Sequence, residues 1–581
     1  MAFKLLAWAL FSLEINASSN MKRRHALTCV GILGGALYFA APIARADVSD
    51  SFNSCTSNGG LYPVDQLIGD CGAAIVSGSI SDEDVAIAFK CRAYAYAAKR
   101  DFDHAIADFT QSIKLNPGVA SAFVGRGRAY FGKGDLASAI ADLSEALKLE
   151  PKSRLARVGR AFAWDRKGEF DRALDDYNIA IDLDRTDASL FVDRSFAWKS
   201  KGDFDRALAD LNEAVRLDPE NSLALSARGE VWRRKGDLAR AAADFNAALE
   251  LNPKELLALT GRGQVYAANG DMDRAIADFG AAIKLAPDDP YSYVNRGRAR
   301  AIKNDHDGAI SDFDAAIRIN GKDAFALLLR GVSFRQKGDL DRAMNDYDEA
   351  IRLNPSMSPA FLRRGNVWAA KGEIDLAIKD YDEAIRIDPK DSVAYHRRAI
   401  AWMRKGDTAR AKSDLNESLA RNPDDVNARW TRGLLRFNLS SFSESGEDFL
   451  IVASKRPERA YDALWLYLAR AREGKDGGVV LAASAEKLKS QDWPYPLVEL
   501  FLGRKGTEQT LSAATDVAKR CEAEFFIGEW QLLHQNWTIA TDALTSAVEI
   551  CPKNYVELSA ALAELPRLAP GQAQSITGAD R

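Results

Sequence analysis

The sequence predicts an all-α solenoid built from antiparallel helix pairs, because it combines a strict period, a recurrent turn and paired apolar stripes. Prolines recur on one 34-residue spacing from Pro117 to Pro457, and only Arg185 and Gly321 interrupt the series. A fixed period of this length over most of the chain is the signature of one supersecondary unit repeated many times. Each unit is then expected to pack mainly on its neighbours.

The turns of the repeat have local physical causes, which the unit Ser222 to Glu255 illustrates. Gly236 can adopt the left-handed conformation that ends a first helix. Asp237 can accept hydrogen bonds from the amides that open a second helix, and Pro253 stops that helix. The same glycine, aspartate and proline recur in most units, so the sequence predicts two helices per unit.

Side-chain size within this unit predicts how its helices pack. Position 1 is Ser222, so small residues stand at positions 8 and 20 (Gly229 and Ala241) and aromatic residues at positions 11 and 24 (Trp232 and Phe245). Small residues allow close crossing, and the aromatic rings fill the space beside them. These offsets resemble the tetratricopeptide repeat. The resemblance implies a right-handed superhelical array whose first helices line a concave groove.

The sequence predicts six segments, divided according to where the 34-residue repeat is kept and where it is lost. Beyond Pro457 the period breaks, and helices are expected at 461–473, 478–488, 497–502 and 509–519. The run 465–568 is similar to a C-terminal cap of exported tetratricopeptide proteins of Gram-negative bacteria. The predicted segments are 1–46 (upstream extension and signal peptide), 47–85 (N-terminal half-repeat cap), 86–459 (eleven tandem units), 460–520 (irregular hairpins), 521–568 (final unit with a capping helix) and 569–581 (disordered tail).

Composition excludes several classes of function. With 47% hydrophobic and 28% charged residues, the chain has the make-up of a soluble globular protein. A net charge of −4 over 581 residues does not suit a nucleic-acid binder. Nucleotide-binding, zinc-protease and serine-hydrolase motifs are absent, and five scattered histidines suggest no metal site. We therefore predict no catalytic residues, cofactor or metal; an enzyme housed in 460–581 is the weakest alternative.

The N-terminal region predicts export. From Met21 a basic segment and an apolar run lead to Ala44-Arg45-Ala46, the pattern of a signal peptide cleaved before Asp47. The chain is then expected in the periplasm. Alternatively, Ala26 to Ala44 is about long enough to remain as an inner-membrane anchor. Lipidation at Cys29 is disfavoured because that cysteine precedes the apolar run.

Cysteines cluster at the two ends of the repeat array. Cys55 and Cys71 can clip the N-terminal element, and Cys521 and Cys551 fall on the two helices of one hairpin. Their spacing permits two disulfides in an oxidising compartment, with buried free thiols as the alternative.

A charged pattern runs through the units. Arginine occupies position 7 from Arg126 to Arg432, and aspartate occupies position 23 from Asp108 to Asp448. These residues can pair within or between units and fix their register. As exposed pairs they would each contribute about 0–1 kcal/mol. A ligand-binding charge stripe is the alternative.

The predicted binding surface is the groove lined by positions 2, 5, 9, 12 and 13 of the first helices. Basic and apolar residues predominate there, which favours a peptide or protein partner with acidic groups and apolar anchors. A lysine–asparagine carboxylate clamp is not supported, because Tyr94 stands where asparagine is needed. The groove residues are Lys90, Arg128, Phe162, Arg166, Phe196, Lys199, Arg233, Arg234, Arg298, Phe325, Arg335, Arg404 and Trp430.

The sequence thus predicts a non-enzymatic protein-binding scaffold in envelope assembly or maintenance, the envelope role following from the family resemblance. A tethered adaptor held by an uncleaved N-terminal helix is the alternative. A scatter of solubilising arginines also remains an alternative to the basic groove.

Overall fold

The computed structural model describes residues 48–56, 63–487, 492–553 and 555–568, and every regular element in these ranges is a helix. The signal peptide, the possible anchor at 26–44 and the tail at 569–581 lie outside the described residues. None of the described helices is long and apolar enough to cross a bilayer. The chain divides into two bodies at residues 321 and 322, and each is described by itself.

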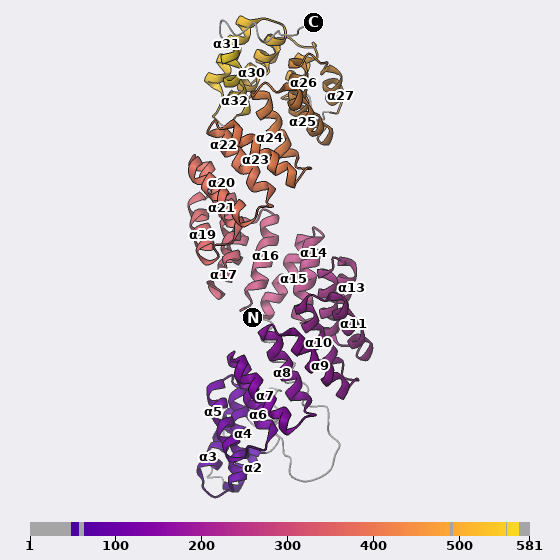
Figure 1. Ribbon diagram of the computed structural model, residues 1–581, viewed down its shortest axis with the longest axis vertical. Helices are drawn as coiled ribbons and strands as arrows, with labels where there is room; N and C mark the ends of the chain where they lie inside the picture. Colours follow the sequence, from indigo (N-terminus) through magenta and orange to yellow (C-terminus); the bar gives the residue numbers. More distant parts are fainter. Residues whose placement is uncertain (1–47, 57–62, 488–491, 554, 569–581) are drawn as a thin grey trace. The chain divides into compact units, whose positions relative to one another are not determined.

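The first body is a stack of helix pairs that follows a short N-terminal hairpin (Figure 1). The hairpin consists of α2 (Val48–Thr56) and α3 (Val64–Val76). The pairs are α4 (Asp82–Ala98) with α5 (Phe102–Leu115), α6 (Ala120–Lys133) with α7 (Leu136–Leu149), α8 (Arg154–Lys167) with α9 (Phe170–Leu183), α10 (Ala188–Lys201) with α11 (Phe204–Leu217), α12 (Ser222–Arg234) with α13 (Leu238–Leu251), α14 (Leu256–Ala268) with α15 (Met272–Leu285) and α16 (Pro290–Ile302) with α17 (His306–Ile319).

The first helix of each pair forms the inner layer of the stack. Each first helix packs against its own second helix and also against the first helix of the next pair, from α4 through to α16. Contact between successive first helices places them on the side toward which a stack of helix pairs curves. Side chains that these helices do not use for packing therefore face the inside of the curve, which we call the inner face.

The turn within each pair has the predicted glycine and helix-capping aspartate in most units. Gly236 has φ +84° and ends α12, and the Asp237 side chain accepts a hydrogen bond from the Arg240 amide at the start of α13. The same left-handed turn persists where glycine is absent, at Arg100 (φ 63°) and Ser440 (φ 58°). Packing of the two helices therefore overrides the local preference of these side chains.

The core is thin and repeats from pair to pair. The fully buried ring of Phe245 lies between Gly229 of its own pair and Gly261 of the next. A Cβ at Gly229 would lie 2.9 Å from the ring, and a Cβ at Gly261 would lie 2.2 Å from it. Glycine at these positions is therefore a packing requirement rather than a source of flexibility.

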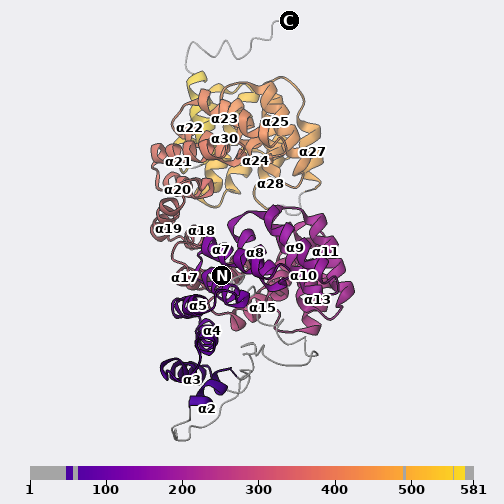
Figure 2. The same cartoon turned by 60° about the horizontal axis from the view of Figure 1, so that its bottom comes forward.

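The second body continues the pairs and ends in a differently organised module (Figures 1 and 2). Its pairs are α18 (Ala324–Gln336) with α19 (Leu340–Leu353), α20 (Ser358–Lys371) with α21 (Ile374–Ile387), α22 (Ser392–Arg404) with α23 (Thr408–Arg421) and α24 (Val426–Asn438) with α25 (Phe442–Lys455). The C-terminal module contains α26 (Ala460–Arg472), α27 (Gly478–Ala485), α28 (Tyr495–Phe501), α29 (Thr507–Ser512), α30 (Val517–Leu533), α31 (Trp537–Ile550), α32 (Val556–Glu564) and the 3-10 helix η2 (Leu565–Leu568).

The C-terminal module differs from the sequence-based expectation in its helix bounds. The single helix expected at 509–519 is interrupted, because α29 ends at Ser512 and α30 begins at Val517. Helix α30 thus begins before Cys521, where the final unit was expected to start. Trp465 organises its core, because this fully buried ring packs against Phe437, Phe449, Phe525 and Phe526. A single large aromatic cluster thus replaces the repeated thin cores.

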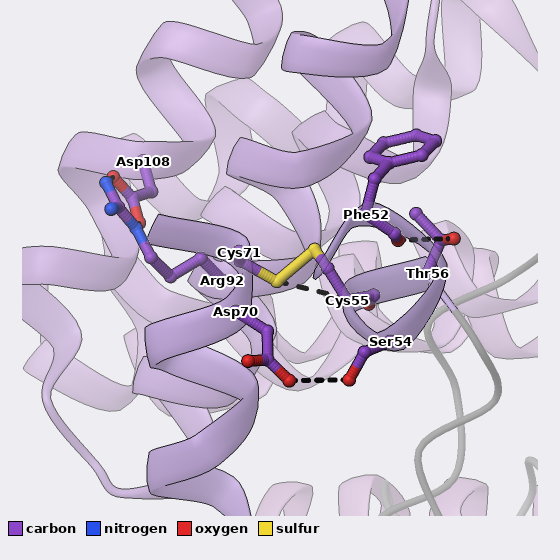
Figure 3. The surroundings of a disulfide bond; sticks show 8 residues. All are labelled: Phe52, Ser54, Cys55, Thr56, Asp70, Cys71, Arg92 and Asp108. Atoms are coloured by element: carbon purple, nitrogen blue, oxygen red, sulfur yellow. Dashed lines mark hydrogen bonds and ion pairs between the residues drawn. A yellow bond between two sulfur atoms is a disulfide. The ribbon is translucent and has the colours of Figure 1, made fainter. Parts of the chain in front are cut away.

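At the N-terminus, where the sequence predicts a half-repeat cap, the structure has a disulfide-linked hairpin of α2 and α3. Cys55 of α2 is bonded to Cys71 of α3, with Cα atoms 4.9 Å apart. Figure 3 shows the bond beside a hydrogen bond from the Ser54 hydroxyl to Asp70, 2.5 Å long. Closing a loop of this length adds about 3 kcal/mol against unfolding, which offsets the small core of this end.

The second disulfide lies in the C-terminal module. Cys521 of α30 is bonded to Cys551, which follows α31, with Cα atoms 4.8 Å apart. Both cysteines are buried. This bond closes the last helix pair, as the spacing of the two cysteines permits.

Candidate protein-binding surface

The arginines at position 7 and aspartates at position 23, counted from Ala86 in steps of 34 residues, form eleven paired contacts that we call the ladder. In each pair the closest guanidinium nitrogen and carboxylate oxygen are 2.6–2.8 Å apart. The aspartate side chains are only 2–11% exposed and the arginines 15–24% exposed. The expectation of weak, exposed pairs is therefore wrong, because both groups lie between packed helices.

The ladder also joins successive pairs. Arg262 donates through Nε and Nη2 to Asp278 of its own pair, and through Nη1 to Asn246 of the preceding pair at 2.9 Å. Arg398 makes the corresponding bonds to Asp414 and to Asp382. One guanidinium thus holds two units in register, and this use explains the ladder without a bound ligand.

The predicted groove residues lie on the first helices, but they differ in how far they reach solvent. The exposed members are Arg166, Arg234, Arg298, Phe325 and Arg404. The half-buried members are Lys90, Arg128, Phe162, Phe196, Lys199, Arg233, Arg335 and Trp430. Within each body, the structure brings together neighbours on successive first helices.

One group of charged residues on the inner face lies on α8, α10 and α12. Buried Glu230 accepts hydrogen bonds from Arg233 (2.8 and 2.9 Å) and from Arg234 (2.8 Å) on the same helix. Burial opposes ionisation of Glu230, but the two arginines outweigh it and lower the pKa of this carboxyl. Two of the predicted cations thus share one carboxylate, so this part of the groove is less basic than the residue count suggests.

Two further members of the group have perturbed acidity. Burial lowers the pKa of Lys199 to about 8, although the attraction of Glu230 opposes this shift. Burial also raises the pKa of Asp165, against the effect of a hydrogen bond from Ser200. The Asp165 Oδ1 atom is buried and makes no hydrogen bond. A polar group supplied by a partner could satisfy this oxygen.

Unsatisfied polar atoms also occur on the second body. The Arg335 Nε atom and the Tyr347 hydroxyl are buried without a hydrogen-bond partner. Burial raises the pKa of Tyr347 to about 12, an effect that nearby Arg335 partly offsets. Because unpaired buried polar atoms cost free energy, these groups favour binding of a partner that pairs with them.

The groove is covered at its C-terminal end. Helix α32 packs against α24, where Asn438 donates to Ser559 (3.3 Å) and its carbonyl accepts from Arg567. Phe437, at position 12 of α24, is fully buried. Trp430, on the same helix, is half-buried and its Nε1 is unpaired. The expected capping helix therefore packs on α24, the first helix of the last regular pair.

Sequence reasoning missed a buried ionic network within the C-terminal module. Arg472 of α26 donates to Glu529 of α30 (2.9 Å) and to Glu564 of α32 (3.0 Å). Burial raises the pKa of Glu529 to about 7 despite the attraction of Arg472. Burial likewise raises the pKa of Glu557 to about 7. Helical periodicity gives no signal for these contacts, since they join segments up to 92 residues apart.

None of these arrangements resembles a metal centre. Among the described residues, no three histidine, cysteine or acidic side chains come together in a geometry that could hold a metal ion. The inner-face charges act instead in ion pairs and hydrogen bonds.

Comparison with known proteins identifies the repeat. The model of the tetratricopeptide repeat family matches residues 92–147, 125–188, 200–255, 260–324, 328–392 and 396–463. No curated protein sequence matches the chain.

Similar folds occur among solved structures. One is YrrB, described as a TPR protein with an unusual peptide-binding site: it is 24% identical, covers 32% of this chain and 95% of its own, and has a TM-score of 0.28. The Cut9–Hcn1 hetero-tetramer of the APC/C is 16% identical over 85% of this chain and 98% of its own, with a TM-score of 0.44. Yeast Tom70 is 17% identical over 73% of this chain and 100% of its own, with a TM-score of 0.34.

Proposed function

We propose that this chain, which belongs to the tetratricopeptide repeat family, is a non-enzymatic scaffold that holds a protein partner on the inner faces of its helix pairs. The proposal rests on the observation that some positions of the first helices serve packing, whereas others vary from pair to pair. Position 7 serves the ladder, and position 8 serves packing against the second helix. Positions 2, 5, 9, 12 and 13 instead carry different side chains from pair to pair.

The chemistry of these positions defines the partner. In the first body, exposed Arg298 and the Tyr291 ring, which is 50% exposed, stand on α16. In the second body, the Phe325 ring is 45% exposed on α18. Cations beside exposed rings favour a peptide segment with acidic groups and apolar anchors. Arg298 is exposed to solvent, so it is one of the residues with which we test the acidic preference.

The test compares inner and outer charges on the full chain. Partners are captured from an extract with the wild type and with an Arg128→Glu, Arg298→Glu variant. The matched control is Arg206→Glu, Arg216→Glu on α11, an outer helix whose arginines are 64% and 67% exposed.

The captured protein is then purified and its affinity is measured for all three forms. We expect the inner-face variant to bind at least tenfold more weakly and the control to bind like the wild type. Equal binding by all three forms, or equal loss in both variants, would overturn the proposal.

We further propose that the scaffold acts in the periplasm, in envelope assembly or maintenance. The signal-like segment from Met21 to Ala46 and the disulfides Cys55–Cys71 and Cys521–Cys551 support this location, since disulfides persist in oxidising compartments. N-terminal sequencing of the mature protein is expected to begin at Asp47. Retention of residues 21–46 in a membrane fraction would instead support the tethered adaptor.

A further inference from the structure

The last helix pair, α30 with α31, keeps the packing of a repeat but lacks its ladder. Counted from Cys521, its position 8 is Gly528, where a Cβ would lie 2.7 Å from Leu544 at position 24. The same contact is 2.9 Å between Gly127 and Leu143 in the array. Position 7 is nevertheless Ile527 and position 23 is Ala543, so neither ladder charge is present.

In the array the ladder guanidinium has a defined environment. The carboxylate of position 23 binds it, and in six pairs an aromatic ring at position 4 lies 5.5–5.8 Å from the guanidinium carbon. Arg364, for example, lies over the Phe361 ring and bonds to Asp380. In the last pair, position 4 is Glu524. A carboxylate thus replaces the ring beside the place that the guanidinium occupies elsewhere.

A pocket of about 300 Å³ lies between α29, α30 and α31. Ile527 and Ala543, the residues at the two ladder positions, both line it together with Glu524. Glu508 of α29 and Asp542 of α31 add two more carboxylates, and none of the lining residues is basic. Glu524 is only 9% exposed, and its contact with Arg520 is long, at 3.9 Å.

We propose that this pocket binds the side chain of an arginine on a protein partner, in the place that the ladder arginine occupies in the other pairs. The three carboxylates surround the guanidinium, and Ile527 and Leu511 contact its aliphatic stem. Arginine fits better than lysine, because its planar guanidinium can bind two carboxylate oxygens at once. This site is separate from the inner faces and does not depend on the proposed function.

The experiment uses the full chain and three acetylated, amidated peptides, Gly-Xaa-Gly, in which Xaa is arginine, lysine or citrulline. Citrulline has almost the shape of arginine but no charge. Chemical-shift changes of isotope-labelled isoleucine methyl groups, Ile527 among them, report binding. We expect the arginine peptide to bind most tightly and the citrulline peptide at least tenfold more weakly. Equal affinities for arginine and citrulline would overturn the proposal.

Three variants test whether the arginine peptide binds in this pocket. Asp542 is exposed, so Asp542→Asn is expected to fold normally and to bind the arginine peptide about tenfold more weakly. Ile527→Arg supplies an internal guanidinium and is expected to abolish binding. Glu549→Gln, an exposed change on the same helix, is the control and is expected to bind like the wild type.

Two results would contradict this assignment. Equal weakening by Asp542→Asn and Glu549→Gln would show attraction to the general acidity of the helix rather than to the pocket. Binding of free arginine without binding of the peptide would show that the pocket takes a small molecule and not a partner's side chain.

Discussion

The array pair α12–α13 and the terminal pair α30–α31 share one packing scheme and differ in what surrounds it. In both, a glycine of the first helix faces a large side chain of the second: Gly229 faces Phe245, and Gly528 faces Leu544. Only the array pair carries the ladder, in which Arg228 joins Asp244 and Asn212. The terminal pair therefore forms without the ladder, whereas in the array Arg228 joins both the two helices of its own pair and the preceding pair.

The two regions also bury apolar surface differently. Along the array, the apolar core is divided into separate clusters, among them those around Phe245 and Phe279. In the C-terminal module one continuous cluster spans α24 to α32, with Trp465 among its buried residues. A solenoid pair depends on its neighbours, whereas a larger shared core supports several irregular helices together. A substitution in the array is therefore expected to destabilise only neighbouring pairs, whereas one in the C-terminal module is expected to destabilise the whole module.

The largest expected effect comes from Trp465→Ala. Truncating a fully buried tryptophan removes its contacts with four phenylalanine rings, so we expect the free energy of unfolding of the C-terminal module to fall by about 4 kcal/mol. Hydrogen exchange should accelerate across 460–568. Trp368→Ala, at a half-buried array position, is the control and should accelerate exchange only in neighbouring pairs. If hydrogen exchange accelerates over equally long segments in both variants, the two regions do not differ in how they transmit a loss of packing.

The stability of the C-terminal module should depend on pH through Glu557. Since burial raises the pKa of Glu557 to about 7, the protonated form is favoured in the folded state, and stability falls as pH rises from about 4.5 to about 7. Glu557→Gln is expected to stabilise the module at pH 8 by about 3 kcal/mol and to have little effect at pH 4. Urea denaturation at both pH values measures this, and an equal change at pH 4 and pH 8 would contradict it.

Breaking the ladder should have a smaller but distinct effect on the array. In Asp244→Ala the half-buried Arg228 loses its bidentate partner, and we expect a loss of about 2 kcal/mol. The control is Asp205→Ala, whose carboxylate pairs with Lys235 but is 85% exposed, and which should cost less than about 0.5 kcal/mol. Thermal unfolding and hydrogen exchange of α12 to α14 compare the two. Equal losses would mean that burial does not strengthen the ladder.

The smallest expected effect tests close packing. Gly261→Ala forces the Phe245 ring to move, because the new Cβ would lie 2.2 Å from it, and should cost about 1–2 kcal/mol. Gly280→Ala is the control, since its Cβ would meet only Arg296 Nη1 at 3.6 Å. Alanine there should stabilise α15 by up to about 1 kcal/mol, because it favours the helix. Opposite signs in urea denaturation are expected, and equal destabilisation would contradict this packing argument.

Much of the fold follows from local patterns. The 34-residue period, Gly236, Asp237 and Pro253 predict where helices begin and end, because turn and cap preferences act within a few residues. The family resemblance then supplies the solenoid and the inner layer of first helices. The irregular C-terminal helices were predicted less well, since short apolar helices such as α28 and α29 have no period to fix their bounds.

The sequence places the candidate groove residues on the first helices but does not show their contacts. Periodicity places Arg233 and Arg234 on the inner face, but it does not reveal that both bind Glu230. The order of residues likewise does not show that α32 covers α24, because these helices are more than a hundred residues apart in sequence.

The sequence by itself thus determined the repeat, the turn chemistry and the pairs of cysteines able to meet, because each depends on spacing along the chain. Tertiary structure alone decided the burial of the ladder, the aromatic core around Trp465 and the carboxylate pocket beside Ile527. These features depend on which surfaces exclude water when distant helices meet. Burial sets the strength of charge and packing interactions, and burial is a property of the folded chain.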